Sequence, residues 1–257
     1  MPVNLEYDIL GSGNPLMILH GLFGSKRNWL SIAKPLSEFA QVIAVDLRNH
    51  GESEHAPTMS YLEMAEDVIH LADQLGLQKF TLAGHSMGGK VAMTAALHYP
   101  DRIRRLMVLD IAPVQTQSGF ARYLDVMQSM PLDRITSRRE AEQHLAGVIT
   151  NDLVRSFLLQ NLVRDQGAFR WRINLQGIRD NLSEIAGFPE MDAGTTYTGP
   201  ALFVAGGRAE YLTPAHEPAI RRYFPNAELH IIQNAGHWLH AEEPAAVLDT
   251  FHQLLNR

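Results

Sequence analysis

Residues 82–89 read Leu-Ala-Gly-His-Ser-Met-Gly-Gly and contain the pattern G-x-S-x-G, centred on Ser86. The apolar run of residues 80–83 before the pattern is typical of a strand, and the spacing of apolar residues over 90–98 predicts a helix. Ser86 is therefore expected on a sharp turn between a strand and a helix. The flanking glycines leave room for helix and strand to approach closely while the serine hydroxyl projects alone, as a nucleophile requires.

The composition excludes several other classes of protein. The chain has 257 residues, 46% of them hydrophobic, which fits one large α/β domain or one domain with an insertion. Its formal net charge of −6 argues against nucleic acid as a partner and against acidic membranes. It has no cysteine, which excludes disulfides, thiolate metal sites and a cysteine nucleophile.

No targeting or membrane segment is visible in the sequence. Residues 1–13 lack the basic and apolar regions of a secretory signal. No apolar run approaches the roughly 18 residues that are needed to span a bilayer. We therefore expect a cytoplasmic protein without a membrane partner, present as a monomer or a homodimer.

Strand and helix patterns alternate along the first 112 residues. A strand pattern over residues 3–10 comes first. Runs typical of buried parallel strands follow at residues 16–19, 42–45, 80–83 and 106–109, and helical stripes lie between them at 28–39, 61–75 and 90–98. Such alternation predicts an α/β fold with a mostly parallel central sheet flanked by helices.

The alternation stops between residues 114 and 198. This segment has helical spacing over 120–130, 137–149 and 153–163, and it shows no convincing strand. Strand and helix patterns then resume at residues 201–205, 214–224, 228–232 and 243–255. We expect residues 1–113 and 199–257 to form one core and residues 114–198 to be a helical cap, or lid, inserted into it.

A serine nucleophile needs a base that removes its proton. In open α/β sheets such groups lie in loops at the carboxyl ends of strands, and this position selects among the twelve histidines. His237 follows the last predicted strand directly after a glycine, in a loop from which it can reach Ser86. His240 is a less favoured candidate for the base, because it is expected to begin the last helix. His20 and His85 are interpreted as structural.

The base in turn needs an acid that orients it and stabilises its charged form. Asp110 ends the strand after the nucleophile turn, where a short side chain is held rigidly. Glu210 follows the strand that precedes His237, in a less constrained loop. Asp46 also ends a strand, but Arg48 offers it a structural ion pair. We favour Asp110 as the acid and leave Glu210 open.

Five stretches of the chain match one family. They are residues 20–25 (HGLFGS), 46–51 (DLRNHG), 84–90 (GHSMGGK), 109–113 (LDIAP) and 236–238 (GHW). Over essentially its whole length the chain resembles an α/β-hydrolase, and within that superfamily the small bacterial serine esterases and acyl thioesterases and their mitochondrial relatives. The second and fourth stretches are more specific to this group than the nucleophile turn.

This resemblance implies roles for five residues. Ser86 would be the nucleophile and His237 the base, and the resemblance supports Asp110 as the acid. The backbone N–H groups of Leu22 and Met87 would form the oxyanion hole.

One position departs from the family pattern. Where the relatives tend to have a serine that is regarded as assisting the histidine, this chain has Ala209. Such assistance is missing here, which is a second reason to leave Glu210 open.

The expected function is that of a carboxylesterase-type serine hydrolase. It would cleave small to medium acyl esters, or acyl thioesters, through a Ser-His-Asp triad and an acyl-enzyme, without metal or organic cofactor. The alternatives are a carbon–carbon bond hydrolase and a ligand receptor on a hydrolase scaffold. Several apolar residues of the expected cap are candidates for an acyl pocket, although most have the helical spacing of a cap core: Phe120, Tyr123, Met127, Met130, Phe157, Phe169, Trp171 and Phe188.

Overall fold

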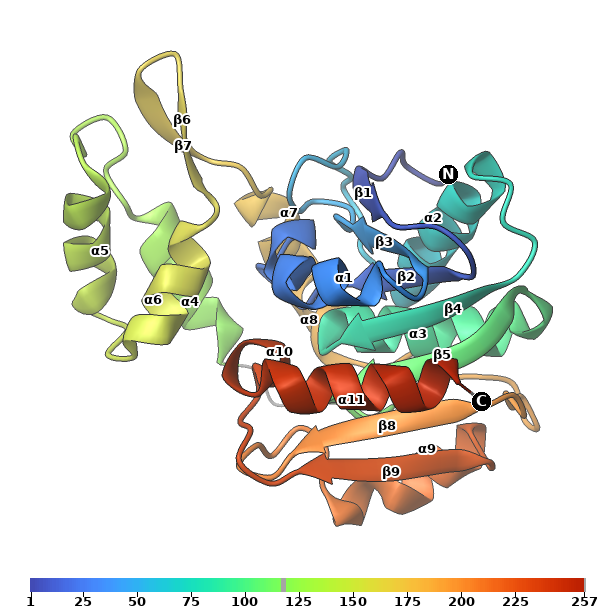
Figure 1. Cartoon of the computed structure of the whole chain (residues 1–257). Helices are drawn as coiled ribbons and strands as arrows, with labels where there is room; N and C mark the ends of the chain where they lie inside the picture. The colour runs from blue at the N-terminus through green and yellow to red at the C-terminus, as the bar shows by residue number, and fades with distance from the viewer. Residues whose placement is uncertain (117–118, 257) are drawn as a thin grey trace.

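The computed structural model describes residues 1–116 and 119–256 (Figure 1). In this part of the chain seven strands form one sheet, in the order β1-β3-β2-β4-β5-β8-β9. The strands are β1 (Tyr7–Leu10), β2 (Pro15–Leu19), β3 (Gln41–Val45), β4 (Phe80–His85), β5 (Ile103–Leu109), β8 (Ala201–Gly206) and β9 (Ala227–Ile232). β1 pairs antiparallel with β3, and the other neighbours pair parallel. The predicted α/β fold with a mostly parallel sheet is therefore confirmed.

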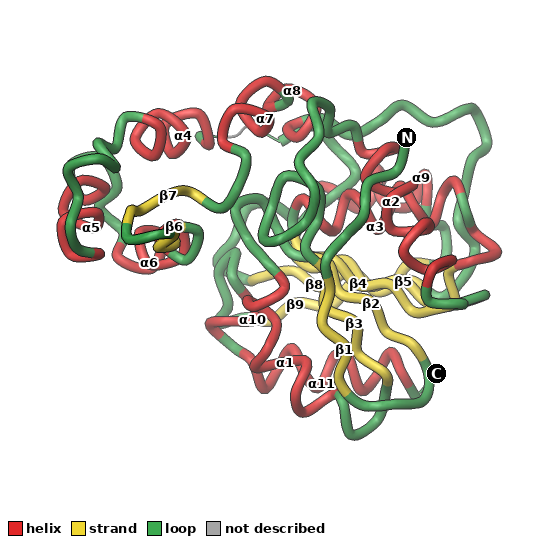
Figure 2. The backbone as a smooth tube through the Cα atoms, turned by 90° about the horizontal axis from the view of Figure 1, so that it is seen from above, coloured by secondary structure: helices red, strands yellow, loops and turns green. Residues whose placement is uncertain are grey.

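Helices cover both faces of this sheet (Figure 2). α1 (Leu30–Leu36) and α11 (Pro244–Leu255) lie on one face, and α2 (Tyr61–Gln74), α3 (Met87–His98) and α9 (Glu217–Tyr223) lie on the other. Shorter helical turns are η1 (Lys26–Trp29), η2 (Pro100–Arg102), η3 (Pro214–His216) and α10 (Leu239–Glu242). The buried apolar side chains accordingly form two clusters, one with α1 and α11 and one with α2 and α3.

The burial of the strands explains their sequences. Every residue of β4 and of β8 is buried, because helices cover both sides of these central strands. Such strands can therefore be continuously apolar. The edge strand β1 instead alternates between exposed and half-buried residues. The contrast is what made the central strands easy to recognise in the sequence.

A block of smaller elements lies between β5 and β8 in the chain, although these two strands are paired in the sheet. The block contains α4 (Phe120–Gln128), α5 (Arg138–Ala146), α6 (Asp152–Leu159), β6 (Leu162–Asp165), β7 (Ala168–Trp171), α7 (Leu175–Asp180) and α8 (Leu182–Ala186). Residues 120–171 project from the core as a lobe, seen at the left of Figure 1. Residues 117–118 of the expected cap and residue 257 of the expected core lie outside the described residues.

The structure corrects the expectation that this block contains no strand. β6 and β7 pair antiparallel as a hairpin, and α6 ends at Leu159, so the end of the expected helix over 153–163 belongs to β6. The turn residues Gln166 and Gly167 both have positive φ, 49° and 91°. Two such residues match the twist of paired strands, but the first is usually asparagine, aspartate or glycine. Because a glutamine occupies this position, the sequence carries no typical signal for the hairpin.

The turn at Ser86 is as tight as its glycines predict. A Cβ atom on Gly84 would overlap the backbone of Gly88. A Cβ atom on Gly88 would lie 2.7 Å from the carbonyl oxygen of Leu19 and 2.5 Å from that of His20. α3 therefore touches β4 and the end of β2 backbone to backbone. Ser86 itself has φ 52° and ψ −118°, a strained conformation for a residue with a side chain.

We predict that Gly88→Ala destabilises the protein by about 2 kcal/mol or more, because the new methyl group overlaps fixed carbonyl groups. The measurement is the free energy of unfolding in urea. Gly147→Ala is the matched control, since Gly147 has φ −62° and its Cβ would lie 3.5 Å from the nearest atom, the His144 carbonyl oxygen. We expect that control to be neutral or stabilising by no more than about 1 kcal/mol. Equal stabilities of the two variants would contradict the packing described for the turn.

Candidate active site

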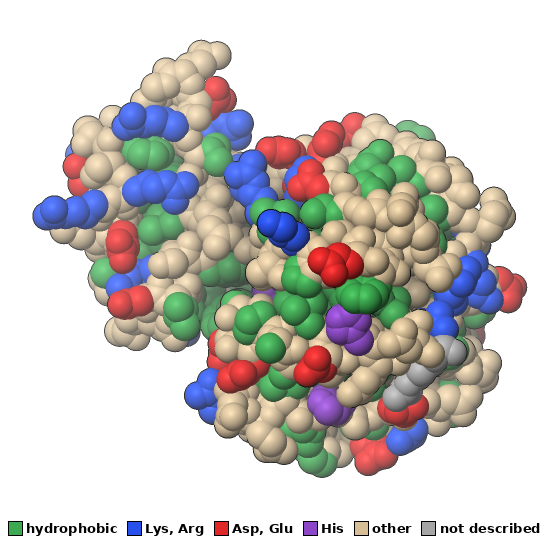
Figure 3. Space-filling view, viewed as in Figure 1, with side chains coloured by type: hydrophobic (Ala, Val, Ile, Leu, Met, Phe, Trp, Pro, Cys, Tyr) green, Lys and Arg blue, Asp and Glu red, His purple; other side chains and the backbone are tan. Residues whose placement is uncertain are grey.

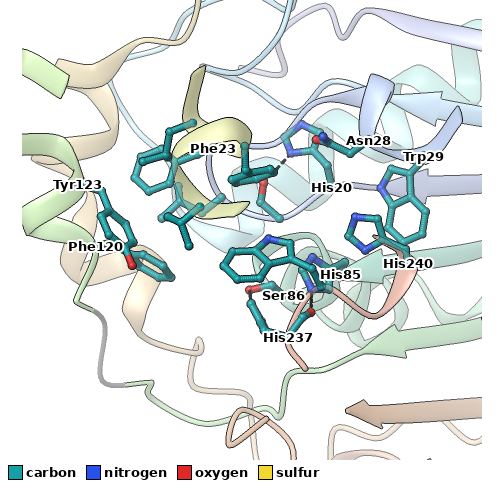
Figure 4. A pocket seen from close by; sticks show the side chains of 16 residues that line it. His20, Phe23, Asn28, Trp29, His85, Ser86, Phe120, Tyr123, His237 and His240 are labelled. Atoms are coloured by element: carbon teal, nitrogen blue, oxygen red, sulfur yellow. Dashed lines mark hydrogen bonds between the residues drawn. The ribbon is translucent and has the colours of Figure 1, made fainter. Parts of the chain in front are cut away.

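Ser86 lies at the junction of β4 and α3, at the carboxyl edge of the sheet. Its backbone N–H donates to the carbonyl oxygen of Leu109 in β5 at 3.0 Å, which ties the turn to the neighbouring strand. Its hydroxyl faces a cavity next to His237, as Figure 4 shows.

His237 reaches the serine from the loop that follows β9. Its Nε2 atom lies 3.2 Å from Ser86 Oγ, and its Nδ1 atom lies 2.7 Å from Asp110 Oδ2. Asp110 directly follows β5 and is fully buried. Its second oxygen, Oδ1, accepts the backbone N–H of Gly206 at 3.0 Å. The structure thus brings Ser86, His237 and Asp110 together in one hydrogen-bonded chain.

The electrostatics of this chain are governed by burial. Burial raises the pKa of Asp110 to about 7, although the N–H group of Gly206 opposes the shift. Burial also lowers the pKa of His237 to about 4, and the charge of Glu242 opposes that shift. Since the two groups are in contact, they take up protons as a pair. In its deprotonated form the pair leaves Nε2 of His237 free to accept the hydroxyl proton of Ser86.

Two side chains that hold the histidine loop were missed in the sequence. The carboxylate of Glu242, in α10, accepts the backbone N–H groups of Gly236 at 2.8 Å and Trp238 at 3.3 Å. The ring of Tyr211 stacks on the His237 imidazole, with 4.0 Å between the ring centroids. The available signal was a carboxylate shortly after the histidine, at the end of the short helix α10. It became informative only once the loop was seen to fold back over it.

The other candidate histidines have different surroundings. Nε2 of His85 donates to the carbonyl oxygen of His237 at 2.7 Å, so His85 supports the loop rather than the hydroxyl. His20 accepts the backbone N–H of Leu47 through Nε2 at 2.9 Å. His240 is buried and stacks on Trp29, with the ring centroids 4.5 Å apart.

Among the described residues, neither of the other candidate acids makes a hydrogen bond or ion pair with His237, which bonds to Asp110. Glu210 lines a different cavity, beside Val114 and His216. Asp46 accepts the backbone N–H groups of Lys26 at 2.7 Å and Glu52 at 2.9 Å, and so shapes the loop after β3.

The expected ion pair between Asp46 and Arg48 is wrong. Arg48 is buried and turns toward α2, where its Nε lies 2.6 Å from Asp67 Oδ2. The cation near Asp46 is Lys26, whose Nζ is 3.9 Å from Oδ2. Adjacency in sequence did not indicate this pairing, because Asp67 comes from a helix nineteen residues further on.

The backbone positions of Leu22 and Met87 flank the serine. Both residues line one cavity together with Ser86. Met87 is the first residue of α3, and the N–H groups of a helix's first turn have no partner within the helix. Leu22 belongs to the glycine-containing loop after β2. Leu22, Ser86 and Met87 therefore lie around the same space.

The main cavity at Ser86 has two different ends (Figure 4). One end is apolar and includes Phe120 and Tyr123 from the expected cap, and the other includes Trp29 and His240. Trp171, another candidate for the pocket, instead donates its indole N–H to the Met127 carbonyl oxygen within the lobe, at 2.9 Å.

Two kinds of site are absent from residues 1–116 and 119–256. No three histidine, aspartate or glutamate side chains gather there as a metal site. None of the helices there combines the length and the apolar character needed to cross a membrane.

Comparisons with known proteins agree on one family. The model of the alpha/beta hydrolase fold family matches residues 14–244. The sn-1-specific diacylglycerol lipase ABHD11 of Danio rerio is 46% identical over 254 residues, covering 95% of this chain and 80% of the relative. The esterase YbfF of Escherichia coli is 36% identical over 250 residues, covering 95% of this chain and 94% of the relative.

The solved structures give the same result. A marine microorganism esterase superimposes with a TM-score of 0.95 at 38% identity, covering 98% of this chain and 99% of that chain. The fold and the sequence comparisons therefore point to relatives that are named as esterases and lipases.

We predict that kcat/KM for a neutral ester is level above about pH 8 and falls about tenfold per unit below about pH 7. The reason is that burial raises the pKa of Asp110 to about 7, so the pair with His237 takes up its first proton there and loses its free base. The measurement is the pH dependence of kcat/KM. A profile that stays flat down to about pH 5 would contradict this description of the pair.

The charge of Glu242 raises the pKa values of both Asp110 and His237. Glu242→Gln should therefore move the acid limb of the profile to lower pH. Glu243→Gln is the matched control at the next residue, and it should leave the limb in place.

Proposed function

This chain belongs to the alpha/beta hydrolase fold family and is an ester-hydrolysing enzyme, and we propose that it is a serine carboxylic-ester hydrolase using Ser86, His237 and Asp110. The observation that carries the proposal is that His237 bonds to Ser86 Oγ through one ring nitrogen and to Asp110 through the other. This arrangement supplies nucleophile, base and orienting acid in contact with one another.

In the first half of the proposed reaction, Ser86 Oγ attacks the carbonyl carbon of the ester while its proton passes to Nε2 of His237. The carbonyl oxygen becomes an oxyanion, and the N–H groups of Leu22 and Met87 donate to it. Asp110 stabilises the imidazolium ion. The tetrahedral intermediate then loses its alcohol, which takes the proton from His237, and an acyl-enzyme remains.

In the second half, water attacks the acyl-enzyme and gives a proton to His237. The bond between the acyl carbon and Ser86 Oγ breaks, the carboxylic acid leaves, and Ser86 regains its proton. Each step uses a side chain or a backbone N–H of this chain. The proposed mechanism therefore needs no metal or organic cofactor.

The apolar end of the cavity supports small to medium acyl chains as substrates, because the aromatic side chains of Phe120 and Tyr123 line it. Oxygen esters and thioesters present the same electrophilic carbonyl group, so both belong to the proposal. The name of the Danio rerio relative suggests acylglycerols as one ester class to include in a substrate series.

We further propose that residues 114–198 act as a cap over the site. Phe120 and Tyr123 of α4 and Phe157 of α6 reach the wall of the cavity that holds Ser86. The core supplies the reacting groups, and the cap supplies the apolar surface that would hold the acyl chain.

We predict that Ser86→Ala lowers kcat for p-nitrophenyl butyrate at pH 8 by about 10⁴-fold or more, because the acyl-enzyme cannot form. The measurement is release of p-nitrophenol. Ser183→Ala, at an exposed serine of α8, is the matched control and should keep the full rate. An unreactive wild type, or a Ser86→Ala variant that keeps its rate, would reject a serine esterase.

Asp110→Asn should lower kcat by about 10³- to 10⁴-fold, because an amide can stabilise neither the charge nor the required tautomer of His237. Glu210→Gln, the control at the other candidate acid, should leave kcat within about twofold. The measurement is again hydrolysis of p-nitrophenyl butyrate at pH 8. A large loss in the Glu210 variant with little loss in the Asp110 variant would exchange the two assignments.

A further inference from the structure

A second cavity, which we call the arginine groove, lies between the hairpin β6–β7 and the loop after β3. In the described part of the chain its wall includes Arg27, Arg164, Arg170 and Arg172 together with Glu52, His55 and Asp165. Figure 3 shows Lys and Arg side chains gathered over the lobe and at its junction with the core. This concentration of cations is local, because the whole chain has a formal net charge of −6.

The carboxylates in the groove do not balance its guanidinium groups. Asp165 is bound by Arg170 at 2.8 Å. Glu52 is shared at longer distances, 3.6 Å from Arg27 and 3.8 Å from Arg172, and it also lies 3.4 Å from Lys26. Four arginines against two carboxylates leave an excess of two positive charges among the groups that line the groove.

Arg172 is the most confined of these cations, with 9% of its surface exposed. Its Nε has no hydrogen-bond partner among the described residues. Its Nη2 makes one long bond, 3.3 Å, to the Gln160 carbonyl oxygen. Burial, and then the charge of Arg27, lower the pKa of Arg172. A buried guanidinium normally has its donors paired, so Arg172 is incompletely paired at the wall of the groove.

A third cavity adjoins both the groove and the cavity at Ser86. Arg27 lines both the groove and this third cavity. The third cavity shares four wall residues with the cavity at Ser86: Asn28, Phe157, Trp238 and His240. The three cavities therefore adjoin one another, with Asn28 between the first and the third and Arg27 between the third and the groove. Phe120 and Tyr123, at the apolar end of the first cavity, do not line the third cavity, so this side suits the alcohol or thiol part of a substrate.

We propose that the arginine groove binds a phosphate group on the leaving-group side of the substrate. Arginine forks bind phosphate oxygens in pairs, and a phosphate dianion matches the excess of two positive charges. The acyl chain would lie at the apolar end near Phe120, and an extended linker would join the ester to the phosphate. This inference rests on the proposed function for the reaction itself, whereas anion binding by the groove is independent of it.

The test compares butyrate esters that differ only beyond the ester bond. ω-Phosphoalkyl butyrates of graded chain length are matched with neutral ω-hydroxyalkyl butyrates and with ω-carboxyalkyl butyrates. At the best length the wild type should show kcat/KM about tenfold or more above the neutral ester, since charge-assisted hydrogen bonds are stronger than those between neutral groups. The preference should shrink as salt is added.

The double variant Arg27→Gln/Arg170→Gln should lose this preference and keep its kcat/KM for the neutral ester. Both side chains are more than half exposed, 60% and 53%, so the fold does not depend on burying them. Arg139→Gln, at an exposed arginine of α5 outside the groove, is the matched control and should keep the preference.

Three results would overturn the proposal. They are equal rates for phosphorylated and neutral esters at every length, a loss of both rates alike in the double variant, and a preference for the carboxylate as large as that for the phosphate.

Binding of inorganic pyrophosphate tests the anion site of the groove independently of ester hydrolysis. Titration calorimetry should detect its binding to the wild type and to the Arg139→Gln control, and much weaker binding to Arg27→Gln/Arg170→Gln. If no ester is hydrolysed, the proposed function is rejected. Pyrophosphate binding then still shows whether the arginine groove binds anions. Absence of pyrophosphate binding to the wild type, or equal binding to the double variant, would reject the anion site.

Discussion

The close approach of α3 to β2 and β4 is the contact on which the rest of the site depends. Only a residue without a side chain fits at Gly88, where a Cβ would meet the carbonyl oxygen of Leu19. This contact lets the chain reverse sharply at Ser86, with a φ of 52°. If α3 were displaced by even the width of a methyl group, the Ser86 hydroxyl and the Met87 N–H would move with it. The packing of the sheet and the geometry of the proposed nucleophile Ser86 are therefore one constraint.

Sheet topology supplies the second condition, which is that distant segments meet at one edge. Asp110 follows β5, and its backbone N–H donates to Val204 in the adjacent strand β8 at 2.8 Å. Its carboxylate accepts from Gly206 at the end of that strand. His237 leaves β9, the next strand along. Because β5 and β8 pair directly, the chain between them is free to form a separate lobe without disturbing the pair of Asp110 and His237.

The sequence predicted those features that depend on local pattern. Continuous apolar runs marked the central strands, and their carboxyl ends pointed to Asp110 and His237. Features set by contacts between distant segments were not predictable in this way. Arg48 pairs with Asp67 rather than with its neighbour in sequence, and Glu242 holds the histidine loop only because α10 folds back beneath it. The hairpin β6–β7 was not predicted for a different reason: its turn has a glutamine at positive φ.

The lobe contributes two surfaces of opposite character. Its helices α4 and α6 present aromatic side chains toward Ser86, whereas its hairpin presents Arg170 and Arg172 toward the loop after β3. A carbonyl group positioned at Ser86 divides any ester into an acyl part and a leaving group. An apolar wall and a cationic wall on different sides of that point can therefore select the two parts independently. Variation in the lobe could change either preference while leaving the hydrogen-bonded chain from Ser86 to Asp110 intact, because that chain is built entirely from loops at the ends of core strands.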